Sequence, residues 1–160
     1  MKDATATSGP ARELLWRLVR PAALLVTIVS GVLVAGVWIP PDFGSPDWEF
    51  GTIHGFLDGL PLFLVGLGLL AAAALAEGRQ ATSSVIGVTF VVIAIAVVLA
   101  GLLMAINLPL AWRASSANPG LHAAVKKGMA KAAVQVGVMS LGCLLMAVKC
   151  LRRDRVAARS

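Results

Sequence analysis

The stretch SVIGVTFVVIAIAVVLAGLLMAINLPL, residues 84–110, decides the fold, because it contains no charged side chain. About 20 consecutive apolar residues suffice for a helix to cross the hydrocarbon core of a bilayer, which is about 30 Å thick. The stretch therefore predicts a transmembrane helix. Its only strongly polar side chain in the second half is Asn107.

The composition of the chain supports the same class. Of its 160 residues, 58% are hydrophobic and 14% are charged, whereas soluble domains are about 45–50% apolar and about 25% charged. Three more apolar runs flank the central one, and the predicted spans cover residues 20–39, 50–76, 84–112 and 121–150. We therefore predict an all-α fold, an integral membrane four-helix bundle formed by residues 13–151. A disordered tail (1–12) and a basic tail (152–160) flank this domain.

Two of the helices have a recognisable start. Ser45 precedes Pro46, and Asn118 precedes Pro119. A hydroxyl or amide side chain at the N-cap, followed by proline at the first helical position, is typical of a helix N-terminus. Both pairs predict that a helix begins there.

The distribution of lysine and arginine predicts the orientation. The net charge is +6, but the cations lie at the ends of apolar segments and not in one patch with aromatic residues, which argues against nucleic-acid binding. Ten lie on the side of both termini, and four lie on the other side: Arg113, Lys126, Lys127 and Lys131. The positive-inside rule then places both termini in the cytoplasm. We expect a multi-pass protein of the cytoplasmic (inner) membrane.

The second span carries the most informative polar pair, His54 and Asp58. A spacing of four residues puts both side chains on one face of a helix. A carboxylate inside a membrane span is costly and normally has a partner. The predicted orientation brings His54, Asp58, Asn107 and His122 near the outer face, so these four are the candidate catalytic residues.

Acidic residues precede the second span, on the same predicted side as the four outer cations. They are Asp42, Asp47 and Glu49. Together with Asp58 they give four acids against four cations on that side, which predicts mutual pairing. The sequence does not choose the pairs.

Three interpretations of the polar site remain open. His54, Asp58 and His122 form a two-histidine, one-carboxylate set, which suits iron or copper with open coordination positions. Without a metal or other cofactor, His54 or Asp58 would act as general base for a weakly acidic substrate. Alternatively, Asp58 has a structural role and bonds to Asn107 or to a lysine of the fourth helix.

Other residue types exclude two kinds of redox chemistry. Cys143 and Cys150 lie seven residues apart without CxxC spacing, so nothing marks them as a thiol relay. The chain contains no tyrosine, which excludes a tyrosyl radical.

Four motifs follow one another along the chain. They are a glycine-rich first span (residues 30–36), a histidine before a proline-aromatic step (residues 54–63), Asn107-Leu108-Pro109 followed by Trp112 and Arg113, and His122 at the start of the fourth helix. This order resembles the anthrone-oxygenase-like family of small four-helix membrane proteins. The resemblance covers roughly residues 22–148. It implies oxidation of a polycyclic aromatic or quinone-like compound at the membrane.

We therefore expect an oxygenase-like oxidoreductase for a lipophilic small molecule that enters from the lipid bilayer. The main alternative is a non-catalytic accessory or assembly subunit of a larger membrane complex, or a homo-oligomer packed through glycine stripes. A transporter is disfavoured, because the inner half of the spans is nearly free of polar residues. A haem held between His54 and His122 is a fourth hypothesis.

Overall fold

The computed structural model describes residues 10–42 and 45–157. These residues form four α-helices and no β-strand: α1 (Pro10–Gly36), α2 (Pro46–Ala76), α3 (Gln80–Ser115) and α4 (Pro119–Ala157). Each helix contains a segment long and apolar enough to cross a membrane. The predicted all-helical class with four candidate spans is thus confirmed. Four helices of this length and composition are typical of a multi-pass membrane protein.

The helices extend beyond the predicted spans at six of their eight ends, whereas α2 ends at Ala76 as predicted and α1 ends at Gly36, three residues before the predicted end of its span. Helix α1 begins at Pro10, so residues 10–12 of the predicted tail are helical, and α4 continues to Ala157 through part of the predicted basic tail. Hydropathy marks only the part of a helix that matches the hydrocarbon core, whereas backbone hydrogen bonding continues past it. The rest of the two predicted tails lies outside the described residues.

Both predicted helix starts are confirmed by their caps. The backbone N–H of Trp48 donates to Ser45 Oγ at 3.4 Å, at the start of α2. The amide oxygen of Asn118 accepts from the N–H of Gly120 at 3.0 Å and from that of Leu121 at 3.3 Å. These side chains satisfy donors that the first turn of a helix leaves unpaired.

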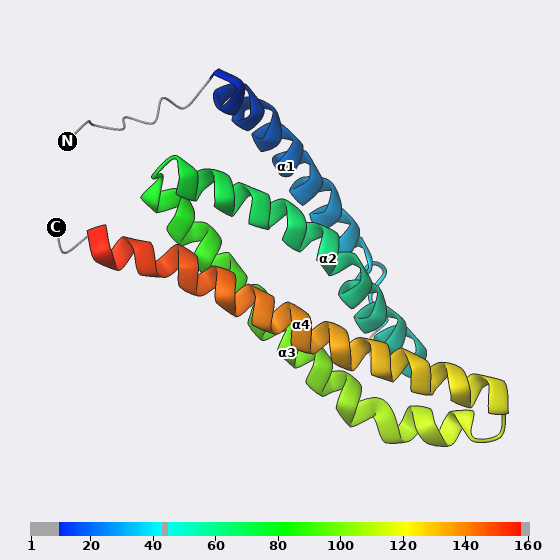
Figure 1. Ribbon diagram of the computed structural model, residues 1–160. Helices are drawn as coiled ribbons and strands as arrows, with labels where there is room; N and C mark the ends of the chain where they lie inside the picture. Colours follow the sequence, from blue (N-terminus) through cyan, green and yellow to red (C-terminus); the bar gives the residue numbers. More distant parts are fainter. Residues whose placement is uncertain (1–9, 43–44, 158–160) are drawn as a thin grey trace.

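The helices form two hairpins, α1–α2 and α3–α4, which meet through α2 (Figure 1). Helix α2 packs against α3 and α4, whereas α1, as far as it is described, packs against α2 alone. Gly66 lets α1 approach closely, because a Cβ there would lie 2.5 Å from Thr27 Oγ1. The four helices are therefore an open arrangement with α1 at its edge.

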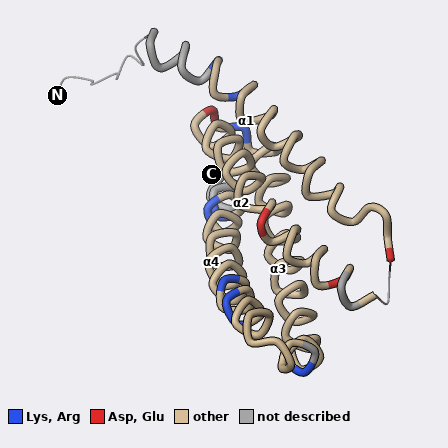
Figure 2. The backbone as a smooth tube through the Cα atoms, turned by 90° about the vertical axis from the view of Figure 1, so that its right-hand side faces the viewer, with Lys and Arg blue, Asp and Glu red and all other residues tan. Residues whose placement is uncertain are grey.

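The hairpins are joined at the end where α2 turns into α3. Glu77 forms ion pairs with Arg20 of α1 and, at 3.0 Å, with Arg79. Ser83 Oγ donates a buried hydrogen bond of 3.2 Å to the carbonyl of Cys150, which ties α3 to α4. At the opposite end, the α1–α2 connection and the α3–α4 connection lie apart in both views (Figures 1 and 2).

The buried core has two parts along α2. One part, near the α2–α3 turn, surrounds Ala71, Phe90 and Cys143. The other surrounds Leu57 and Met104 and lies directly beside Asp58 in the chain. This second part forms the apolar base on which the polar residues of α2 and α4 rest.

Candidate functional site

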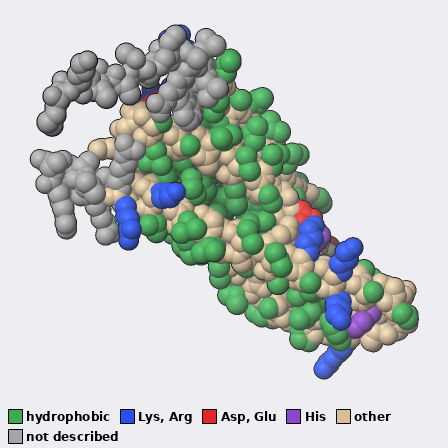
Figure 3. Space-filling model, in the orientation of Figure 1, with side chains coloured by type: hydrophobic (Ala, Val, Ile, Leu, Met, Phe, Trp, Pro, Cys, Tyr) green, Lys and Arg blue, Asp and Glu red, His purple; other side chains and the backbone are tan. Residues whose placement is uncertain are grey.

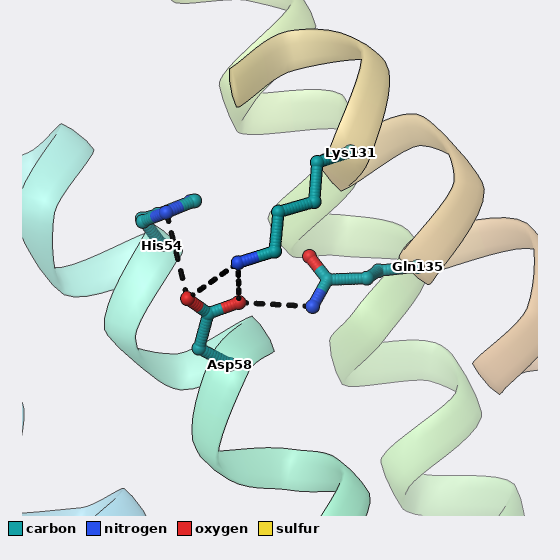
Figure 4. Close-up of polar contacts among 4 residues, drawn as sticks. All are labelled: His54, Asp58, Lys131 and Gln135. Atoms are coloured by element: carbon teal, nitrogen blue, oxygen red, sulfur yellow. Dashed lines mark hydrogen bonds and ion pairs between the residues drawn. The ribbon is translucent and has the colours of Figure 1, made fainter. Parts of the chain in front are cut away.

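Asp58 is the centre of a polar cluster that joins the two hairpins. Lys131 Nζ lies 2.7 Å from Asp58 Oδ1 and 2.8 Å from Oδ2. Gln135 Nε2 donates to Oδ1 at 2.9 Å, and His54 Nε2 lies 3.5 Å from Oδ2 (Figure 4). We call these four residues, His54, Asp58, Lys131 and Gln135, the Asp58 cluster.

The spacing of the cluster residues is the same on both helices. His54 and Asp58 are four residues apart on α2, and Lys131 and Gln135 are four residues apart on α4. Each pair therefore occupies one face of its helix, and the two faces meet where α2 crosses α4 (Figure 4). The buried side chains of Leu57 and Ala132 directly adjoin Asp58 and Lys131 in sequence.

The cluster is open on one side. The side chains of His54, Asp58 and Lys131 are 37%, 39% and 51% exposed. In Figure 3 an acidic side chain reaches the surface beside basic ones. Two atoms on the inner side, His54 Nδ1 and Gln135 Oε1, are buried without a hydrogen-bond partner in the described part of the chain.

The depth of the cluster follows from its place on α2, which begins at Pro46. At the rise of an α-helix, Asp58 lies roughly 18 Å along the helix axis from that first residue. The cluster is therefore well inside the candidate span of α2, which covers Trp48–Ala76.

The other two predicted site residues lie elsewhere. His122 is held at the α3–α4 turn, where its Nδ1 lies 3.2 Å from Ser115 Oγ. Its ring meets that of Trp112 edge-on, with centroids 4.3 Å apart. Asn107 is half-buried in α3, and no hydrogen bond joins it to the Asp58 cluster within residues 10–42 and 45–157. The structure thus brings together His54 and Asp58 but neither Asn107 nor His122.

The residues expected to bind a metal are consequently not assembled. No group of three or more His, Cys, Asp or Glu side chains among the described residues is placed to hold a metal ion. Lys131 and Gln135 are the residues of α4 that meet Asp58, and His122 precedes Lys131 by roughly 13 Å of helix. Ligands of one iron or copper ion all lie within about 2–3 Å of it, so the set His54, Asp58 and His122 does not fit a shared ion.

Sequence reasoning named one of the two α4 partners and missed the other. A lysine of the fourth helix was one of the expected structural partners of Asp58, and Lys131 takes that place. Gln135 was missed because it lies in a segment that is otherwise apolar. The signal was present, since Lys131 and Gln135 repeat the four-residue spacing of His54 and Asp58.

Two of the pockets among the described residues lie beside the C-terminal half of α3. One has a volume of about 350 Å³ and opens between α3 and α4. Its lining is Val98, Gly101, Leu102, Met104, Ala105, Met129, Ala132, Ala133 and Val136. The other, of about 440 Å³, is lined by Leu108, Pro109, Trp112 and Arg113. The first pocket adjoins the Asp58 cluster along α4, because Ala132 and Val136 directly follow Lys131 and Gln135 in the chain.

No protein-family model, curated protein or solved structure matches this chain. The resemblance to the anthrone-oxygenase-like family therefore stays an expectation from its motifs. The Asp58 cluster and its surroundings are the features that bear on function.

Proposed function

We propose that this protein is a multi-pass protein of the cytoplasmic membrane, with both termini in the cytoplasm, and that the Asp58 cluster is the site of an oxygenase-like oxidoreductase. Its substrate is a lipophilic compound of the polycyclic aromatic or quinone-like type. The four apolar helices and the excess of cations on the side of the termini support the placement. In this orientation the cluster lies in the outer half of the spans.

The observation that carries the proposal is the half-exposed Asp58–Lys131 ion pair with His54 beside it. An ionisable group inside a membrane span is expensive and commonly marks a functional site. This cluster combines three such groups and is open on one side. The apolar pocket along α4 would accept the hydrocarbon part of a substrate that enters from the bilayer.

The chemistry assigned to the cluster is proton abstraction followed by reaction with dioxygen. His54 takes a proton from an acidic methylene group that is conjugated to a ketone through the aromatic rings, and Asp58, held by Lys131 and Gln135, stabilises the imidazolium that forms. Lys131 also offsets the negative charge that develops on the ketone oxygen. Dioxygen takes up the electron pair of the carbanion, and the peroxide anion that forms takes the proton back from His54. Loss of water from the resulting hydroperoxide leaves a second ketone. We assign no step to a metal, since the described side chains bring only two of the three expected ligands together.

Oxygen consumption by the purified protein in lipid vesicles tests this proposal. Anthrone, a tricyclic ketone with an acidic methylene group, is the probe, and its spontaneous oxidation in empty vesicles is the background. We expect a protein-dependent rate that falls by about 100-fold or more in His54→Asn, since general-base catalysis contributes about 10²–10⁴-fold. Lys149→Gln, which changes an exposed lysine at the other end of α4, is the control and should keep the full rate. A wild-type rate equal to the background would refute the assignment for this substrate class.

The hydrogen bonding of Asp58 favours a second function, that of an accessory subunit. Lys131 and Gln135 already link the carboxylate to α4, so the cluster is also explained as a helix-to-helix contact. In that case purification in mild detergent would yield a stoichiometric larger subunit, and Asp58→Asn would release it. Isolation of the wild-type protein without any other subunit would count against this function.

A further inference from the structure

The two hairpins carry opposite charges at their outer ends. No lysine or arginine occurs between Arg20 and Arg79, and this part of the chain contains the acids Asp42, Asp47, Glu49, Asp58 and Glu77. No acidic residue occurs from residue 80 to residue 153, and the outer half of that hairpin carries Arg113, Lys126, Lys127 and Lys131. We call residues 42–58 the acidic arm and residues 113–131 the basic arm.

The described parts of the two arms meet at their base, where the Asp58–Lys131 pair joins them. Beyond this pair the connections diverge, with the acidic residues of one hairpin apart from the lysines of the other (Figure 2). Asp42, Lys126 and Lys127 are exposed, and none of them forms an ion pair with another residue that the structure describes. The pairing expected between the outer acids and cations is thus shown for Asp58 and Lys131.

A second copy of the chain offers each arm its opposite. Two copies inserted in the same direction are related by a two-fold axis along the membrane normal, and such an interface is isologous. Every surface used in it must therefore complement another surface of the same chain. The acidic and basic arms meet this condition, because four arms from two copies can alternate in sign around the axis.

We propose that the protein is a homodimer in which the acidic arm of each copy packs against the basic arm of its partner. The arrangement also places both Asp58–Lys131 pairs next to the interface, where protein instead of lipid faces their exposed sides. An unrelated partner would need to match both signs at once, whereas a second copy does so by symmetry. The inference rests on the insertion proposed above but not on the chemistry of the Asp58 cluster.

Two charge-reversed chains provide the test. The first, Asp42→Lys/Asp47→Lys/Glu49→Lys, changes the net charge of its acidic arm from −4 to +2, so that it carries two basic arms. The second, Arg113→Glu/Lys126→Glu/Lys127→Glu, changes the net charge of its basic arm from +4 to −2, so that it carries two acidic arms. Each chain receives a different affinity tag, and each is expressed alone or together with the other. The oligomeric state is measured by light scattering in mild detergent at low salt, where exposed charges are screened least. Lys149→Gln is the control and should dimerise like the wild type.

We expect the wild type to be dimeric and each reversed chain alone to dimerise at least 10-fold more weakly. Co-expression should restore a dimer that contains one copy of each chain, because its arms are again opposite in sign. If the arms instead closed on each other within one chain, the wild type would be monomeric and the reversed chains would not co-purify. Either of those results would overturn the proposal, as would unchanged dimers of each reversed chain alone. Because oxygen consumption is not measured, failure of the proposed activity leaves this test unaffected.

Discussion

Replacing Asp58 alone should destabilise the protein more than replacing Asp58 and Lys131 together. Lys131 Nζ contacts both oxygens of the carboxylate, at 2.7 and 2.8 Å. Asp58→Asn removes the negative charge and leaves the ammonium group without its partner inside a candidate span. Asp58→Asn/Lys131→Met removes both charges, so no unpaired ion remains.

The magnitude follows from the position of the pair. An unpaired lysine at the centre of a membrane helix costs about 2.5–3.5 kcal/mol, whereas losing a fully exposed ion pair costs only about 0.2–1 kcal/mol. Lys131 is 51% exposed and lies in the N-terminal half of α4, away from the middle of the helix, so the cost lies between these limits. We expect about 1–2 kcal/mol for Asp58→Asn, and a coupling energy of about 1 kcal/mol between the two sites.

The assay is equilibrium unfolding in mixed micelles, followed by tryptophan fluorescence, for the wild type, the two single variants and the double variant. A second cycle with Lys149→Met in place of Lys131→Met is the control, because Lys149 lies at the other end of α4. That control cycle should be additive within about 0.3–0.5 kcal/mol. If the effects of Asp58→Asn and Lys131→Met on the free energy of unfolding were additive to the same degree, the ion pair would not form in the protein. That result would refute the reasoning.

Two further predictions concern the packing that supports the site. Gly66→Ala should destabilise the protein by about 1–3 kcal/mol, because its Cβ would lie 2.5 Å from Thr27 Oγ1 and 2.9 Å from Thr27 N. In the matched variant Gly68→Ala the new Cβ meets nothing within 4 Å. That variant should be neutral or stabilising by up to about 1 kcal/mol, and equal melting temperatures for the two variants would contradict the close α1–α2 contact. Ser83→Ala removes the buried bond to the Cys150 carbonyl. Its loss should cost about 0.5–1.5 kcal/mol in the same unfolding assay, and no measurable cost would mean that this bond does not hold α3 to α4.

The number of helices could be predicted because the signals for it are local. An uncharged run such as residues 84–110 has one stable form in a bilayer, where every backbone polar group must be satisfied within the segment. The caps at Ser45 and Asn118 act within three residues, so they too can be read directly. Helix ends were less predictable, because backbone hydrogen bonding continues where hydropathy falls, as at Pro10 and Ala157.

The site could be predicted only as far as it is local. His54 and Asp58 belong to one helix face, and their association follows from their spacing. The partners on α4 lie 73 and 77 residues farther along the chain. To identify them, one must know how the two helices are positioned relative to each other along their axes. The sequence predicts that a carboxylate in a membrane span has a partner. It does not predict how far α4 is shifted along its axis relative to α2, and this shift decides which residue of α4 becomes the partner.

The separation of His122 from Asp58 has a specific cause. Asp58 comes twelve residues after Pro46, where α2 begins, and Lys131 comes twelve residues after Pro119, where α4 begins. The two helices therefore meet at equal distances from their first residues. His122 comes only three residues after Pro119, so it lies roughly 13 Å along α4 from the residue that pairs with Asp58.

This difference in position along the two helices separates groups that the sequence predicted to lie close together. A histidine at the start of α4 is carried away from Asp58, and Lys131 occupies the level where a ligand was expected. Beyond the Asp58–Lys131 pair the acidic and basic arms diverge (Figure 2). The level at which α2 meets α4 thus accounts for the missing metal ligand, and the divergence of the arms leaves charges that a second copy would match.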